Sequence, residues 1–160
     1  NSLTTIDLSR NKLAKLALKP FESLYRLKFF IADENELEEF DSEFFDSSKC
    51  DLQSISLSKN PKLGKVIEKE AIQRESYLSS LELSGLNLES ISDNFFIQMI
   101  HLNKLDLSNN QLKKVNKSWF IGLRQLKRLD LTGNQIDQID AKDFESLDNL
   151  EYLNMSRNNI

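Results

Sequence analysis

One pattern of about 24 residues returns seven times along the chain, and this repetition limits the possible folds more than any other feature. The repeats begin at leucines spaced 24, 25, 26, 24, 24 and 24 residues apart. These leucines are Leu3, Leu27, Leu52, Leu78, Leu102, Leu126 and Leu150. A fixed period of this length indicates one supersecondary unit stacked on copies of itself. We therefore expect a single repeat domain over residues 1–160.

The opening segment of each repeat predicts a strand. In the first repeat, apolar and polar residues alternate, so Ile6 and Leu8 point one way and Thr5 and Asp7 the other. This alternation is typical of a half-buried strand. One such unit cannot bury its apolar face alone. Stacked neighbours should therefore form a seven-stranded parallel sheet over a continuous core.

The pattern resembles the leucine-rich repeat signature L-x-x-L-x-L-x-x-N-x-L over essentially the whole chain. The fifth repeat reads LNKLDLSNNQL (Leu102 to Leu112) and the sixth reads LKRLDLTGNQI (Leu126 to Ile136). The full 24-residue form is similar to the "typical" subclass found in Toll-like receptors, Slit-type proteins and secreted insect immune proteins. The resemblance implies an α/β fold: a right-handed, curved solenoid with a parallel sheet on its concave face and an irregular or short-helical convex side.

The resemblance also assigns a structural role to the asparagine at the ninth repeat position. Its amide is expected to turn inward and satisfy backbone N–H and C=O groups of adjacent turns, which need partners when buried. The residues of this ladder are Asn11, Asn35, Asn60, Asn110, Asn134 and Asn158. The fourth repeat has Leu86 instead, so Asn87, a water molecule or a relaxed turn must substitute, because an unmet buried group costs about 1–3 kcal/mol.

Further columns of apolar residues follow each strand, and we expect them to be buried. The first contains Leu16, Phe40, Val66, Ile91, Val115 and Ile139, and the second is an aromatic spine of Phe21, Phe45, Phe96, Phe120 and Phe144. The register slips in repeats two and three. There, the helix formers of residues 65–76 predict a short helix on the convex side.

Two groups of residues stand out from the Ser, Thr and Asp of the predicted concave face. Phe29 and Ile31 place apolar groups on it, which can mark a contact site unless a loop covers them. Farther along, Lys104, Arg128 and Tyr152 lie beside aspartates; the alternatives are cross-strand ion pairing and a binding hot spot. The candidate ligand-binding residues are Phe29, Ile31, Lys104, Asp106, Arg128, Asp130 and Tyr152.

Catalysis, a metal site and a cofactor find no support in the sequence. Cys50 is the only cysteine and we expect a buried, inert thiol; His101 is the only histidine and we expect a surface or capping residue. No apolar run approaches the roughly 18 residues of a membrane span. The net charge of −4 argues against nucleic acid as a partner.

The resemblance implies non-catalytic recognition of another protein, as part of an extracellular receptor or a secreted innate-immune protein. Asn116 and Asn154 begin N-glycosylation sequons, although about two are expected by chance in this composition. A glycan on Asn154 would block the concave face. The alternatives are an intracellular scaffold, since a single cysteine suits a reducing compartment, and a repeat appendage of a hydrolase whose catalytic domain lies elsewhere.

The chain opens directly on a repeat and stops at the eleventh position of another. We therefore expect a segment of a longer solenoid whose capping repeats lie outside it. Any homo- or heterodimer would form through those outer parts. Flanking sequence, with or without a signal peptide and cysteine-rich caps, would distinguish an extracellular from a cytoplasmic protein.

Overall fold

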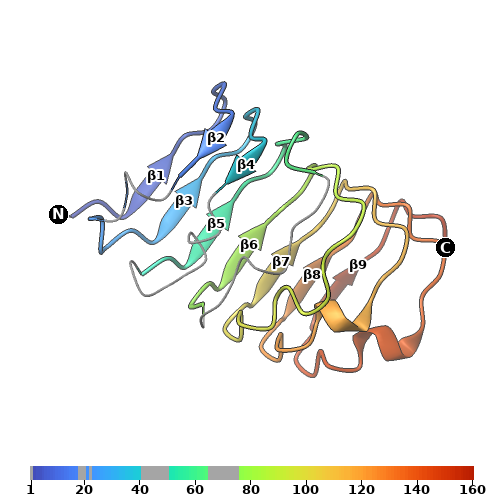
Figure 1. Cartoon of the computed structure of the whole chain (residues 1–160). Coiled ribbons are helices and arrows are strands. Elements are labelled where there is room, and N and C mark those ends of the chain that lie inside the picture. Colours follow the sequence, from blue (N-terminus) through green and yellow to red (C-terminus); the bar gives the residue numbers. More distant parts are fainter. Residues whose placement is uncertain (1, 18–20, 22, 41–50, 65–75) are drawn as a thin grey trace.

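A seven-stranded parallel sheet is the main element of the computed structural model, which describes residues 2–17, 21, 23–40, 51–64 and 76–160. The strands follow one another in chain order from the N-terminal to the C-terminal end (Figure 1). They are β1 (Thr5–Asp7), β3 (Phe29–Ile31), β5 (Ser54–Ser56), β6 (Ser80–Glu82), β7 (Lys104–Asp106), β8 (Arg128–Asp130) and β9 (Tyr152–Asn154). The predicted solenoid fold is confirmed.

Neighbouring strands pair without any shift in repeat position. Lys104 of β7 lies opposite Arg128 of β8, which in turn lies opposite Tyr152 of β9. The same register holds at the other end, where Thr5 pairs with Phe29. Because side chains alternate across a strand, equal repeat positions form columns on one face of the sheet.

The remainder of each repeat forms only short elements within the described part of the chain. A second parallel sheet pairs β2 (Lys15–Leu16) with β4 (Glu39–Phe40). Two 3-10 helices, η4 (Lys117–Trp119) and η5 (Ala141–Phe144), lie on the outer side of the sheet (Figure 1). No helix among the described residues has the length and apolar character needed to cross a membrane. The predicted convex helix covers residues 65–76, and all of them except Ser76 lie outside the described residues.

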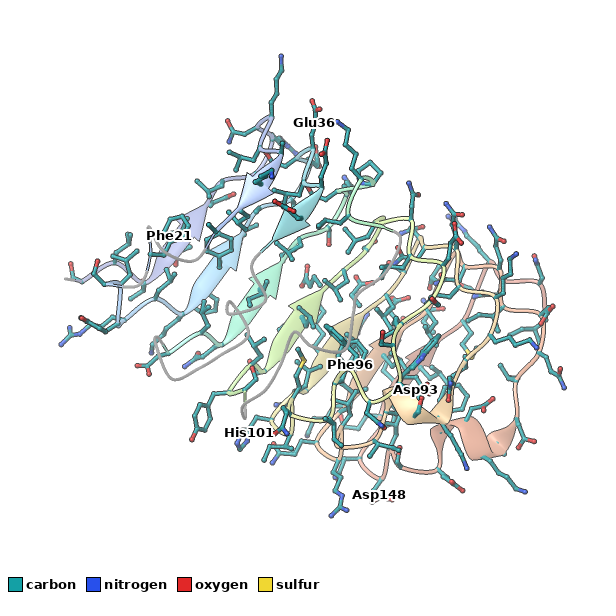
Figure 2. The ribbon with its side chains drawn as sticks, in the orientation of Figure 1. Phe21, Glu36, Asp93, Phe96, His101 and Asp148 are labelled. Carbon is teal, nitrogen blue, oxygen red and sulfur yellow. The ribbon has the colours of Figure 1, made fainter. Side chains whose placement is uncertain are left out.

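The hydrophobic core lies behind the sheet and is continuous from repeat to repeat. Leu105 and Leu129 of neighbouring strands are fully buried. In the aromatic column, Phe96 and Phe120 are also fully buried, and the ring of Phe120 stacks on that of Phe144 with centroids 5.8 Å apart. The column is therefore a packed spine rather than a ligand pocket, with Phe96 beneath the convex segments in Figure 2.

The other apolar column differs from expectation at one described position. Leu16, Ile91 and Val115 are buried, but Ile139 is 42% exposed. Ile139 belongs to the sixth repeat, and residues 1–160 do not include the matching position of the seventh repeat, which would pack over it. The expectation that Ile139 is buried was wrong for this reason. The side chains of the two remaining members, Phe40 and Val66, and Phe45 of the spine lie outside the described residues.

Asn110 shows how the asparagine column holds successive turns together. Its side-chain amide donates to the carbonyl oxygens of Leu83 at 2.9 Å and Leu107 at 3.0 Å, which belong to two successive repeats. Its Oδ1 accepts from the backbone N–H groups of Leu86 and Leu88. Asn35, Asn60, Asn134 and Asn158 make the equivalent bonds to their own and the preceding repeat.

The irregular turn of repeat three explains how repeat four does without its asparagine. Asn60 accepts a bond from the N–H of Leu63 at 3.0 Å through its backbone carbonyl, so the turn closes on itself. An asparagine at position 86 would otherwise supply the acceptor for that N–H. A side chain on Gly64 would place its Cβ 1.7 Å from the carbonyl oxygen of Leu86, so the two turns touch through backbone. The Asn87 side-chain amide also donates to the Pro61 carbonyl of repeat three at 3.2 Å. Two of the three expected solutions, Asn87 and an altered turn, are therefore present together.

Candidate functional site

The concave face of the sheet carries three columns of side chains. At the third repeat position they are Thr5, Phe29, Ser54, Ser80, Lys104, Arg128 and Tyr152; at the fifth Asp7, Ile31, Ser56, Glu82, Asp106, Asp130 and Asn154; and at the seventh Ser9, Asp33, Ser58, Ser84, Ser108, Thr132 and Ser156. This surface is polar except at a few positions. Those positions are where a ligand-binding surface must be sought.

Phe29 and Ile31 lie on one strand, β3, and on the same face. The Phe29 side chain is 42% exposed and Ile31 is half-buried, so neither is fully covered by the described residues. Residues two apart on a strand are about 6.6 Å apart, which places the two side chains next to each other. Together they form an apolar patch in the N-terminal half of the face.

Asp33 lies just beyond this patch and is half-buried. Its Oδ1 accepts from the Ser56 hydroxyl at 2.6 Å and from the Ser58 backbone N–H at 2.9 Å. Burial raises the pKa of Asp33, and the carboxylates of Glu82 and Asp7 raise it further, whereas the two hydrogen bonds lower it. Negative charge at this point is therefore not fully compensated.

Lys104 pairs with Glu82 of the preceding strand, with its Nζ 2.7 Å from the carboxylate. Cross-strand ion pairing is therefore confirmed for Lys104, but its partner is a glutamate rather than an aspartate of a neighbouring strand. Asp106 and Asp130 instead each accept from the backbone N–H group two residues later in the sequence. The Ser108 N–H donates to Asp106 at 2.9 Å, and the Thr132 N–H donates to Asp130 at 3.0 Å. The aspartate column thus caps the ends of the strands.

Arg128 and Tyr152 form a contact across β8 and β9. The guanidinium carbon of Arg128 lies 3.9 Å from the centroid of the Tyr152 ring, a cation–π arrangement. Tyr152 is 39% exposed. The pair gives the C-terminal half of the face an aromatic and cationic group. It is separated from the Phe29 patch by β5, β6 and β7.

The two sequon asparagines have different surroundings. Asn116 lies outside the sheet, where it caps η4 by accepting from the Ser118 N–H and donates to the Asp93 carboxylate at 3.0 Å. Asn154 lies on the concave face and accepts from the N–H of Ser156 at 3.1 Å. A glycan on Asn154 would stand beside Tyr152 of the same strand, whereas one on Asn116 would leave the face open.

One aromatic pair was not predicted from the sequence. Tyr77 and His101 stack with ring centroids 5.2 Å apart and an interplanar angle of 18°. They belong to the edge where the strands begin, whereas Glu36 lies at the opposite edge (Figure 2). Both residues directly precede the first leucine of their repeats, and this shared position was the signal that would have found them. Cys50 lies outside the described residues.

Within the described ranges, no group of three or more His, Cys, Asp or Glu side chains is arranged to hold a metal ion. The chemistry that the concave face offers is hydrogen bonding, charge and apolar contact. These are the means of noncovalent binding.

Comparisons with known proteins agree with this geometry. A family model for the leucine-rich repeat matches residues 76–136 and 100–160. The crystal structure of the TLR13–ssRNA13 complex is 27% identical, with a TM-score of 0.86, over 98% of this chain and 22% of that chain. The leucine-rich repeat domain of APL1B is 22% identical, with a TM-score of 0.75, over 98% of this chain and 41% of that one, and shows the fold alone. No curated protein sequence matches.

Proposed function

The chain belongs to the leucine-rich repeat family, and from this premise we propose that its concave face binds another protein, as part of an extracellular receptor or a secreted innate-immune protein. The observation that carries the proposal is the pair of exposed aromatic sites on a face otherwise made of Ser, Thr and Asp. Phe29 is 42% exposed at one end, and Tyr152, stacked on Arg128, is 39% exposed at the other. Aromatic residues and arginine dominate the energy of protein interfaces.

The extracellular and immune setting is supported by the comparisons and by the repeat subclass. The chain resembles TLR13 at 27% identity over 98% of its own length, and the match spans only about a fifth of that protein. The roles of the whole TLR13 chain are therefore carried over as a proposal. TLR13 is in complex with single-stranded RNA in that structure, so RNA must be one arm of any test of the partner class.

A selection experiment tests the proposal although the partner is unidentified. The immobilised chain is offered a phage-displayed random peptide library and, separately, a random single-stranded RNA pool. We expect peptide binders whose affinity falls about tenfold in Phe29→Ala or Tyr152→Ala, because each variant removes an exposed aromatic contact. The matched control is Ile121→Ala, which removes an apolar side chain of similar exposure (45%) outside the concave face.

Two results would count against the proposal. Binders that lose affinity equally in Ile121→Ala and in the concave variants would show that the face has no special role. Enrichment of RNA alone, with no peptide that depends on Phe29 or Tyr152, would replace protein by nucleic acid as the partner class. The expectation from net charge that nucleic acid is not bound stays a prediction until then.

A further inference from the structure

We propose that the N-terminal half of the concave face binds a cationic segment of its protein partner, in which an arginine or lysine contacts Asp33 and Asp7 and an adjacent apolar residue packs on Phe29. This inference rests on the proposed function and specifies the chemistry of its partner. Four features of the surface support it.

The first feature is the charge of the face. Among its three columns are five carboxylates, those of Asp7, Asp33, Glu82, Asp106 and Asp130, and two cationic side chains, Lys104 and Arg128. The face therefore accounts for three of the four units of net negative charge on the chain. Lys104 is paired with Glu82, and Arg128 is stacked on Tyr152 in the other half. No lysine or arginine of these columns belongs to β1, β3, β5 or β6.

The second feature is the state of Asp33. Its carboxylate is half-buried, and it accepts hydrogen bonds from the neutral donors of Ser56 and Ser58. Among the described residues, no cationic group lies within ion-pair distance of it. A partly desolvated carboxylate attracts an incoming cation more strongly than an exposed one, because the attraction between opposite charges increases as the local dielectric constant falls.

The third feature is the shape of the surface beside Asp33. A hollow of about 470 Å³ is lined by Asp7, Ser9, Arg10, Ile31, Asp33 and Glu34. It has one apolar wall, Ile31, and around it are three carboxylates and the guanidinium of Arg10. Arg10 is directed to Glu34, with its Nε 3.4 Å from that carboxylate. A long cationic side chain fits this lining, because its aliphatic stem can lie on an apolar wall while its charged head meets a carboxylate.

The fourth feature is the apolar anchor. Phe29 lies two residues before Ile31 on the same face of β3, about 6.6 Å away. It pairs with Thr5 on one side and Ser54 on the other, so small polar neighbours leave its ring accessible at 42%. A partner residue packed there would be adjacent to a cationic side chain in the hollow. A phosphate backbone would instead meet like charge along this half of the face.

The experiment uses three synthetic peptides of equal length as probes. The first has a tryptophan flanked by arginines, the second replaces the arginines with glutamates, and the third replaces the tryptophan with serine. Binding is measured by fluorescence anisotropy at about 50 and 300 mM salt, since exposed charges are screened over this range. We expect the arginine–tryptophan peptide to bind at least about tenfold more tightly than the glutamate peptide and to weaken at high salt.

Matched variants separate the site from general attraction to an acidic protein. We expect Asp7→Asn with Asp33→Asn to weaken binding of the first peptide by about tenfold, and Phe29→Ser to weaken it severalfold. The control pair, Asp137→Asn with Asp148→Asn, changes the net charge by the same amount away from the concave face, with Asp148 at the edge where the strands begin (Figure 2). It should change affinity by less than about twofold.

A second kind of variant distinguishes loss of binding at the site from unfolding of the chain. Ser54→Lys adds a cation beside Phe29 at a half-buried surface position and should abolish binding while leaving the melting temperature near that of the original chain. Equal weakening by the concave pair and the control pair would overturn the inference. So would equal binding of the arginine and glutamate peptides.

Failure of this inference is distinguishable from failure of the proposed function. Library peptides that depend on Phe29 or Tyr152 but show no enrichment in lysine or arginine would leave concave recognition standing and refute the cationic partner. Absence of any concave-dependent peptide would refute recognition itself.

Discussion

At the scale of single residues, the central asparagines of the ladder make more backbone bonds than the exposed asparagine at its N-terminal end. Asn110 is 5% exposed and connects two successive repeats through both ends of its amide. Asn11, in the first repeat, is exposed and donates only to Leu8 and Ser9 of its own turn. The number of backbone groups that a ladder asparagine satisfies therefore depends on whether it is buried between two repeats.

The first prediction concerns Asn110→Leu. We expect a loss of unfolding free energy in the upper part of the range of about 1–3 kcal/mol, because the buried N–H groups of Leu86 and Leu88 lose their acceptor. Urea denaturation measures it. Asn11→Leu is the internal control and should cost clearly less. Equal costs for both variants would contradict the structural role assigned to the ladder.

The second prediction concerns Asp33 and pH. Its pKa is higher in the folded chain than the ordinary 3.8, so the folded state holds the proton more tightly than the unfolded state. The ionised form therefore costs stability at neutral pH, and the cost disappears as pH falls through the folded pKa. Asp33→Asn should raise the melting temperature slightly at pH 7, and the gain should shrink toward pH 4. A variant that melts lower than the original chain at pH 7 would show that the two hydrogen bonds to the ionised carboxylate stabilise the fold more than its burial destabilises it.

At the scale of elements, the turn of repeat three and the strand end of repeat four are coupled. The extra residue in repeat three lets Asn60 close the turn on Leu63, and Gly64 then contacts the carbonyl of Leu86 through backbone alone. The extra residue after Asn60 and the leucine at position 86 are both departures from the repeat pattern, and they thus compensate each other.

The third prediction follows from this coupling. Leu86→Asn restores the repeat signature, yet we expect it to destabilise the chain by about 1–3 kcal/mol. Leu86 is 1% exposed. The Leu63 N–H, from which the new amide oxygen would accept a hydrogen bond, already donates to the Asn60 carbonyl within the turn. The measurement is again the midpoint of urea denaturation. Stabilisation by this consensus substitution would mean that the turn does not satisfy Leu63.

At the scale of the whole 160-residue segment, the outermost strands of the sheet are β1 and β9. In the sheet, β1 and β9 each pair with a strand on one side only. Apolar side chains are exposed there: Leu3 at 46%, Leu153 at 40% and Ile160 at 64%. Unpaired strand edges with apolar neighbours favour association.

The fourth prediction is that the 160-residue chain associates in solution. Its sedimentation coefficient should rise over about two orders of magnitude in concentration, because association follows mass action. Leu153→Lys should reduce this effect by placing a charge at the β9 end. A concentration-independent monomer with a sharp melting transition would contradict the prediction.

Much of the candidate site was predictable because strand geometry is local. Alternation along β3 placed Phe29 and Ile31 on one face, and the period aligned Lys104, Arg128 and Tyr152 in one column. Contacts within that column were not predictable. Arg128 lies over the Tyr152 ring, while Lys104 reaches back to Glu82.

The period, the strands, the columns and the asparagine ladder follow from the amino-acid order alone, because each depends on spacing along the chain and on the need to bury apolar groups and satisfy backbone hydrogen bonds. The packing of the chain in three dimensions settled which charges meet. Strands about 4.8 Å apart offer a long side chain several partners, and the backbone N–H groups of Ser108 and Thr132 compete for the aspartates. It also decided that Asp33 lies half-buried beside Ile31, since that depends on the packing of three strands at once.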